Sequence, residues 1–374
     1  MRAHPWVTSL EPAWRVRLEA LAKRRGWPIS DEAVADGVRR LSDAYNGQGR
    51  APGDLDPAVQ AARLLFFLPR DTPKSAGAVR DWIGRAPDRP LRILDLGAGL
   101  GATSLGVVRA WRASGHVAPV SVVAADAEPS AAELIREVLR GDAEIRSTHA
   151  DARTLASDGG FDLVLLGQVI CELDRRLPED DRADAHAAWI AELRATVKPG
   201  GAVVVVEPAL RDGTRHLMRV RDRLVGRGLS PYAPCTHDAP CPMLPRATDW
   251  CHEWLAVDLP AWLQPVARAA GLRWEGLSYA RLVLADDPRP LGRFRATSDL
   301  LPSKGRSDVW LCGEGAWRKV GRQDRHRAAE NAAFDDISRG DMVDMAGEGC
   351  EPGAPKPAVR AATVVRIADP IRRD

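Results

Sequence analysis

The feature that most constrains the fold is a series of short apolar segments that alternates with amphipathic helical segments from Leu91 onward. The apolar segments predict strands, and several of them are apolar at nearly every position. Such strands are buried on both faces, which is typical of a parallel sheet covered by helices on each side. We expect an α/β fold with seven strands, at residues 92–96, 120–126, 144–151, 161–167, 201–208, 279–286 and 308–313.

The remaining segments surround this core. Residues 1–90 carry apolar side chains at helical spacing and predict an N-terminal helical region, with the stretch LPRDTP at 68–73 as a break between helices. The main domain is expected over 91–340, with a cysteine-containing insertion at 209–256. Residues 341–374 combine a Gly/Pro-rich stretch with a strand-like run, so they predict either a short β element or a flexible tail.

The net charge does not indicate a partner, because 53 Lys and Arg nearly balance 51 Asp and Glu. No segment approaches the ~18 consecutive apolar residues of a membrane span, and the N-terminus lacks the apolar core of a signal peptide. We therefore expect a cytoplasmic chain without membrane contact. In a reducing compartment its six cysteines do not predict disulfides. The sequence does not fix the oligomeric state, and a monomer is the expectation.

A glycine-rich turn, DLGAGLG, follows the first predicted strand and contains Asp95, Gly97, Gly99 and Gly101. Glycines there allow the backbone to approach a ligand closely at the start of a helix. The glycines alone also fit a nicotinamide site, since Ala102 completes G-x-G-x-x-G/A. The acidic residue two places before the first glycine resembles the methyltransferase form of the motif, as does the later stretch VKPGGAVVVVEP. This resemblance favours S-adenosylmethionine.

Three more residues are candidate contacts of that cofactor. Asp126 ends the second strand, where a carboxylate can accept the ribose hydroxyls, and Asp151 ends the third, where this superfamily contacts adenine. The alternative is that each acid caps the following helix. Gln168 lies in the loop 167–173, which should border the sulfonium carbon.

Cys171, in the same loop, is expected to be a small buried cysteine rather than a nucleophile. The loop lacks the N-P-P-Y-like stretch of base amino-methylating enzymes and the Pro-Cys setting of carbon-methylating enzymes. No catalytic residue is assigned, although methyl transfer can depend on positioning alone.

The most specific stretch contains Cys235, Cys241 and Cys251, three cysteines within 17 residues. Cys312, on the last predicted strand, is the best candidate for a fourth ligand. Soft thiolates suit zinc or an iron–sulfur cluster. The spacing C-x5-C-x9-C fits a zinc knuckle poorly, while His237 and His252 keep a mixed zinc site open. The C-x3-C-x2-C triad of radical S-adenosylmethionine enzymes is absent from the sequence.

The chain resembles the methyltransferase-like proteins of the mitochondrial small ribosomal subunit and their bacterial homologues. The matching stretches are PCTHDAPCP (234–242), DWCH (249–252), LPSKGRSDVWLCG (301–313) and RGDMV (339–343). The resemblance implies a [4Fe-4S] cluster bound by Cys235, Cys241, Cys251 and Cys312, and a role in assembly of the small subunit. The family's usual N-E-L after the fourth strand is replaced here by Cys171-Glu172-Leu173.

Two basic runs flank the cysteines and favour the small ribosomal subunit or its RNA as partner, although solvated helix faces are the ordinary explanation. They are Arg211, Arg215, Arg219, Arg221, Arg223 and Arg227, and Lys304, Arg306, Arg318, Lys319, Arg322, Arg325 and Arg327. The leading hypothesis is an S-adenosylmethionine-binding, iron–sulfur methyltransferase-like protein of small-subunit assembly, with ribosomal RNA as a methyl acceptor. Its rivals are a catalytically silent assembly factor and a small-molecule methyltransferase with structural zinc.

Overall fold

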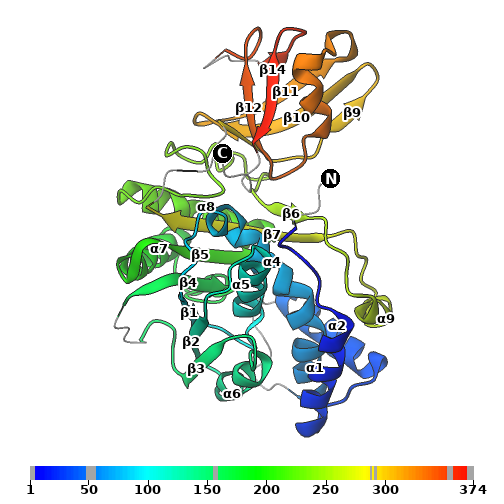
Figure 1. The fold of residues 1–374 in the computed structure, drawn as a ribbon, viewed down its shortest axis with the longest axis vertical. Coiled ribbons are helices and arrows are strands. Elements are labelled where there is room, and N and C mark those ends of the chain that lie inside the picture. The colour runs from blue at the N-terminus through cyan, green and yellow to red at the C-terminus, as the bar shows by residue number, and fades with distance from the viewer. Residues whose placement is uncertain are drawn as a thin grey trace.

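The computed structural model describes residues 5–47, 56–154, 159–286, 289, 293–351 and 357–368. Figure 1 shows a larger body, in which helices surround a sheet, and a smaller body of strands at the top. Each body contains one seven-stranded sheet. Within the described residues, no helix has both the length and the apolar composition needed to cross a membrane.

The first sheet confirms the predicted parallel core, with the strand order β3-β2-β1-β4-β5-β7-β6. Strands β1 to β5 run parallel, and β7 is antiparallel to both of its neighbours. The strands that match six of the predicted segments are β1 (Leu91–Leu96), β2 (Val120–Asp126), β3 (Glu144–His149), β4 (Phe161–Gly167), β5 (Val197–Pro208) and β7 (Leu277–Ala285).

The prediction for the seventh strand is wrong. Residues 308–313 lie in β10 (Arg306–Gly313), which belongs to the second sheet. The outermost strand of the first sheet is β6 (Glu253–Leu255), within the segment expected to be an insertion. With only three residues and a buried glutamate, β6 has no apolar run to reveal it. In β10, Val309 and Leu311 enter a separate core, a half-buried pattern typical of antiparallel sheets.

The described part of residues 1–90 is helical, as predicted. It forms α1 (Pro12–Arg24), α2 (Asp31–Gly47), α3 (Pro57–Ala62) and α4 (Leu68–Ile83), with a π-helical turn at Arg63–Phe67. The expected break at 68–73 is wrong, because α4 runs through it with Pro69 in its first turn and Pro73 inside. The helix continues into α4 directly from the π-helical turn, since Phe67 and Leu68 both have right-handed helical φ and ψ.

Helices cover both faces of the first sheet. On one face, α1 to α4 pack together with α5 (Ala102–Ala113) and α6 (Pro129–Val138). On the other face lie α7 (Glu179–Ala195) and α8 (Arg211–Gly226). Neighbouring residues of β4 enter opposite cores, Leu163 one and Val164 the other, which explains why the strand is apolar throughout. A short helical segment between β6 and β7 comprises η2 (Ala261–Leu263) and α9 (Gln264–Ala269).

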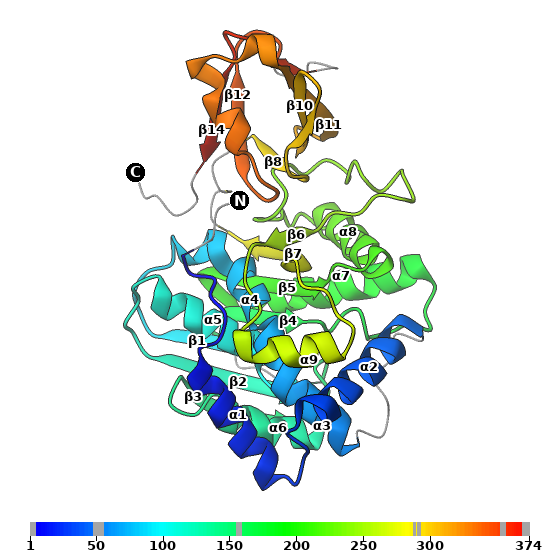
Figure 2. The same cartoon turned by 90° about the vertical axis from the view of Figure 1, so that its right-hand side faces the viewer.

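The second sheet has the order β13-β11-β10-β8-β12-β14, with β9 paired to β10. Figure 2 shows it curving around its own core next to β6 and β7. The described part of 341–374 joins this sheet, while residues 352–356 and 369–374 lie outside the description. The elements are β8 (Phe294–Ala296), β9 (Leu301–Ser303), β10, β11 (Ala316–Gln323), η3 (Asp324–His326), η4 (Ala329–Asp336), β12 (Met342–Ala346), β13 (Ala358–Val359) and β14 (Val364–Ala368).

Candidate functional site

The glycine-rich loop joins β1 to α5. Gly97, Gly99 and Gly101 all have positive φ, at 67°, 50° and 88°. A Cβ atom on Gly97 would lie 2.6 Å from Val169 Cγ2, and one on Gly101 would lie 2.7 Å from Ile135 Cγ1. A Cβ on Gly99 would meet nothing within 4 Å. Gly97 and Gly101 therefore allow close packing of the loop, whereas Gly99 leaves space for a ligand to approach the backbone.

Two of the predicted carboxylates support this loop. Asp95 is fully buried, and its Oδ2 accepts a hydrogen bond of 2.6 Å from Ser104. Burial raises the pKa of Asp95 to about 7. The Asp126 carboxylate accepts backbone N–H bonds from Gly99 at 2.7 Å and from Glu128 at 2.8 Å. Asp126 thus ties the glycine loop to the residue before α6 and lies beside the candidate ligand space, whereas the N-cap position of α6 is Glu128.

The other two predicted contacts differ in their surroundings. Asp151 is exposed, and its carboxylate accepts the backbone N–H of Arg153 at 2.8 Å, which closes a local turn. Gln168 has a φ of 60°, and its backbone N–H donates to Val206 at 2.7 Å. Its side-chain amide lies 3.5 Å from Asp71 Oδ2 on α4. The structure therefore places Gln168 at the carboxyl end of β4, next to α4. Asp151 shows no contact with the glycine loop among the described residues.

A buried charged group on α4 was missed by sequence reasoning. Asp71 and Lys74 are both buried and lie 3.1 Å apart, and Arg70 pairs with the same carboxylate at 2.7 Å. Burial raises the pKa of Asp71, but Arg70 and Lys74 more than offset this and leave it below its usual range. Because 68–73 was expected to be a break, helical spacing was not applied there, and it would have placed Asp71 and Lys74 on one face.

Glu207 is the second missed residue. It ends β5, is fully buried, and accepts the backbone N–H of Ile170 at 3.0 Å through Oε1. Burial raises the pKa of Glu207 to about 7. Burial and the neighbouring Glu207 raise the pKa of Cys171 well above its usual value, so the thiol stays protonated and is a poor nucleophile. The available signal was a carboxylate at the end of an otherwise apolar strand.

The four cysteines of the predicted ligand set line one cavity. Cys235, Cys241 and Cys251 come from the irregular segment between α8 and β6, and Cys312 comes from β10. The cavity holds about 580 Å³ of atom-free space, including the part open to solvent, against roughly 30 Å³ for one water molecule. Among the described residues, no three His, Cys, Asp or Glu side chains are placed to hold a single metal ion.

Burial and mutual repulsion control the charge of these thiols. Burial raises the pKa of Cys241 to about 11, and burial with the neighbouring cysteines raises those of Cys251 and Cys312 further. His237 Nε2 lies 3.7 Å from Cys312 Sγ. On α8, Arg221 donates to the backbone oxygens of His237 and Ala239 and so orients the loop that carries the first two cysteines.

The match to a family model comes from the region that holds most of these features. Residues 77–288, more than half of the chain, match the family described as mitochondrial small ribosomal subunit Rsm22. The chain belongs to the Rsm22 family. The matched region contains the glycine loop and three of the four cysteines, while Cys312 lies beyond it in the second sheet. A search of the curated proteins finds no match.

Several solved structures are similar to this Rsm22 family member. One is a putative class I S-adenosylmethionine-dependent methyltransferase from Listeria monocytogenes, with 16% identity, 70% of this chain and 71% of that chain covered, and a TM-score of 0.36. Another is precorrin-6y C5,15-methyltransferase from Geobacter metallireducens, with 15% identity, 56% and 87% covered, and a TM-score of 0.35. A third is the N-methyltransferase NodS from Bradyrhizobium japonicum, with 14% identity, 57% and 94% covered, and a TM-score of 0.32.

The first predicted basic run is largely committed to contacts inside the protein. Five arginines of α8 and its end have carboxylate partners, and Arg215 donates to three backbone oxygens of the cysteine segment. The carboxylate pairs are Arg211–Asp212 at 2.9 Å, Arg219–Glu179 at 2.5 Å, Arg221–Asp222 at 2.7 Å, Arg223–Asp180 at 3.1 Å and Arg227–Asp184 at 3.5 Å. These contacts support the ordinary explanation of the run, a paired helix face.

The second run keeps some unpaired charge. Arg306 and Lys319 share Asp308, and Arg322 is buried beside Asp335. Lys304 and Arg325 are exposed, and neither forms an ion pair with the part of the chain that the structure describes. A backbone hydrogen bond of 2.9 Å between residues 305 and 324 places their two segments side by side.

Replacement of Glu207 should reveal its titration. Because the folded-state pKa is raised, the stability associated with this group is present below about pH 4.5 and is lost as pH rises through about 7. We expect Glu207→Gln to gain stability over the unmodified protein between pH 5 and 8, by about 3 kcal/mol at most. Urea unfolding at both pH values measures this, with the exposed Glu275→Gln as control. Parallel pH profiles for Glu207→Gln and the unmodified protein would contradict it.

Proposed function

We propose that this Rsm22 family member binds S-adenosylmethionine at its glycine loop, holds an iron–sulfur cluster on four cysteines, and acts on the small ribosomal subunit or its RNA during assembly. The observation that carries the proposal is that cysteines from two separate parts of the chain line one cavity beside the first sheet. The family's description supplies the ribosomal part. A cytoplasmic location stays a prediction, since that description names a mitochondrial subunit.

The support for S-adenosylmethionine is the geometry around Gly99. Its backbone faces open space, and its N–H is held by Asp126 at the end of the neighbouring strand. The seven-stranded sheet has the strand count expected for a methyltransferase. Gln168, Asp71 and Lys74 lie at the end of β4, where the methyl acceptor would bind, and offer polar contacts to it. Glu207 can hold a proton there near neutral pH.

Gly99→Ala should weaken S-adenosylmethionine binding, because its Cβ would enter the proposed ligand space. We expect about a tenfold rise in Kd by isothermal titration calorimetry. Gly26→Ala is the matched control, since Gly26 also has positive φ, 71°, and a Cβ there meets nothing within 4 Å. Both variants carry a similar backbone penalty of about 1–2 kcal/mol. Equal binding by the two variants would show that the cofactor does not lie against Gly99.

The four cysteines around this cavity supply the set of thiols that an iron–sulfur cluster uses. Arg221 and Arg281 also line the cavity and can offset part of the negative charge of four thiolates. When bound, the cluster would supply a cross-link between the irregular segment and β10.

Cys251→Ser should lower the iron and acid-labile sulfide content of protein purified without oxygen. We expect about four irons and four sulfides per unmodified chain, and loss of stability together with the metal in the variant, since metal-binding energy is also folding energy. Cys350→Ala is the control, because Cys350 is buried in the core of the second sheet. Zinc alone in the unmodified protein would favour the small-molecule methyltransferase.

Lys304→Gln/Arg325→Gln should weaken co-sedimentation with immature small subunits and reduce its salt dependence. The control Arg223→Gln/Arg227→Gln removes the same charge from α8, where both arginines are already paired. We expect the first variant to lose binding at modest salt and the second to keep it. The reverse order would place the RNA contact on α8. If the unmodified protein does not co-sediment, the ribosomal part of the proposal fails. Binding without transfer of labelled methyl groups would identify the silent assembly factor.

A further inference from the structure

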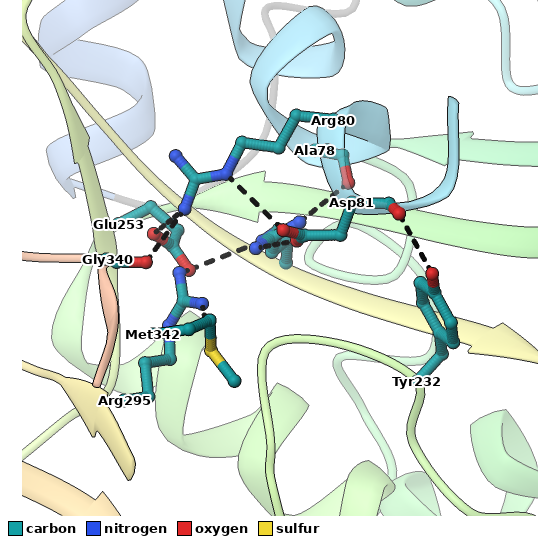
Figure 3. Close-up of polar contacts among 9 residues, drawn as sticks. Ala78, Arg80, Asp81, Tyr232, Glu253, Arg295, Gly340 and Met342 are labelled. Atoms are coloured by element: carbon teal, nitrogen blue, oxygen red, sulfur yellow. Dashed lines mark hydrogen bonds and ion pairs between the residues drawn. The ribbon is translucent and has the colours of Figure 1, made fainter. Parts of the chain in front are cut away.

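A buried group of five charged residues lies where the two sheets meet (Figure 3). Glu253 on β6 is its centre. Its carboxylate pairs with Arg295 on β8, with Arg281 Nε on β7 at 3.3 Å, and with Arg80 on α4 at 3.6 Å. Asp81, also on α4, pairs with Arg281. Figure 3 shows Arg80 and Arg295 approaching Glu253 from opposite sides.

The charges within this group do not cancel. Three arginines face two carboxylates, and Arg295 is the member that comes from the second sheet. Burial raises the pKa of Glu253, but the surrounding guanidinium groups more than offset this and keep it below its usual range. Without Arg295, two arginines and two carboxylates remain on α4, β6 and β7, and the charges of this group then balance.

The strand register connects this ion pair to the cysteine cavity. Arg295 on β8 lies directly opposite Cys312 on β10. Glu253 follows Cys251 by two residues along the chain. The Arg295–Glu253 pair therefore joins the strand next to Cys312 to the strand that begins just after Cys251. A second contact runs from Arg80 to the Gly340 carbonyl at 3.1 Å, and the Gly340 N–H donates to Ala296 on β8 at 2.8 Å, so it reaches the same strand through the backbone.

We propose that Arg295 is a positioning residue for the cysteine cavity, because its ion pair with Glu253 brings Cys312 of the second sheet to the three cysteines of the first body. The metal-related part rests on the proposed function, whereas the placement of Cys312 does not. Loss of the pair should separate Cys312 from its partners while both sheets stay folded.

Arg295→Met tests this more cleanly than a change at Glu253. Replacement of Glu253 would leave three buried arginines around Asp81, and uncompensated buried charge is strongly destabilising. Arg295→Met leaves a balanced set and keeps the apolar length of the side chain. The matched control is Arg306→Met, which removes an ion pair with Asp308 inside the second sheet while Lys319 still pairs with that carboxylate.

The first measurement uses metal-free full-length protein in which Cys235 and Cys241 are Ser, so that Cys251 and Cys312 are the remaining cavity thiols. A short bifunctional thiol reagent and peptide mapping give the Cys251–Cys312 cross-linking rate. We expect Arg295→Met to lower this rate about tenfold, Arg306→Met to leave it unchanged, and Arg295→Lys to restore part of it. Circular dichroism and S-adenosylmethionine binding by the same samples verify that the first body is folded. An unchanged rate in Arg295→Met would overturn the proposal.

The second measurement is the iron and sulfide content of Arg295→Met with all its cysteines, which we expect to fall with the cross-linking rate. A slower cross-link in a protein that never contains iron would sustain the positioning role and reject the cluster. Full iron content in Arg295→Met would overturn the positioning role and leave the cluster in place.

Discussion

The joint between the two sheets depends on one buried carboxylate. Glu253 is 2% exposed, and an ionised group at that depth is destabilised by several kcal/mol unless partners replace its water. Its partners come from α4, β7 and β8, which are distant in sequence. Arg80 and Arg281 compensate it within the first body, and Arg295 completes its surroundings when the second sheet docks. Folding of the outer strand β6 and docking of the second sheet therefore favour each other.

The same joint controls the cysteine cavity. Arg281 belongs to the ion group and also lines the cavity, so the two features share a wall. Burial raises the pKa of Cys241, Cys251 and Cys312, which keeps these three thiols neutral at physiological pH. Conversion to thiolates in so buried a place needs more positive charge than Arg221 and Arg281 supply. A soft cationic group would supply it, and its binding energy would add to the docking of the second sheet.

The sequence predicts those parts of the fold that local pattern determines. Continuous apolar runs identified the central strands, since burial on both faces favours apolar residues at nearly every position. The glycine-rich turn was predicted separately, because its glycines allow backbone conformations that other residues rarely adopt. The cysteines of the predicted ligand set do share one cavity. The outer strand β6 could not be predicted, because its three residues are held by β7 and by the ions around Glu253 rather than by their own pattern. Residues 308–313 were assigned to the wrong sheet for the same reason, because the pattern of a short apolar strand does not determine which strand it pairs with.

The surface charge was the property least well predicted from the sequence, because the partners that neutralise a basic run come from distant parts of the chain. The arginine run on α8 looks strongly basic along the chain, yet the acidic start of α7, some 40 residues earlier, lies against it and takes most of that charge. Glu179 and Asp180 also lie in the first turn of their own helix and stabilise its N-terminus through the helix dipole, so they have a local reason to be acidic. Basic side chains without an ion-pair partner can bind a phosphate backbone directly, whereas a paired arginine must first lose its carboxylate partner. Lys304 and Arg325 meet that condition on neighbouring segments of the second sheet, beyond the matched part of the chain. The proposed contact with an anionic partner therefore lies on the second sheet, apart from the glycine loop of the first body.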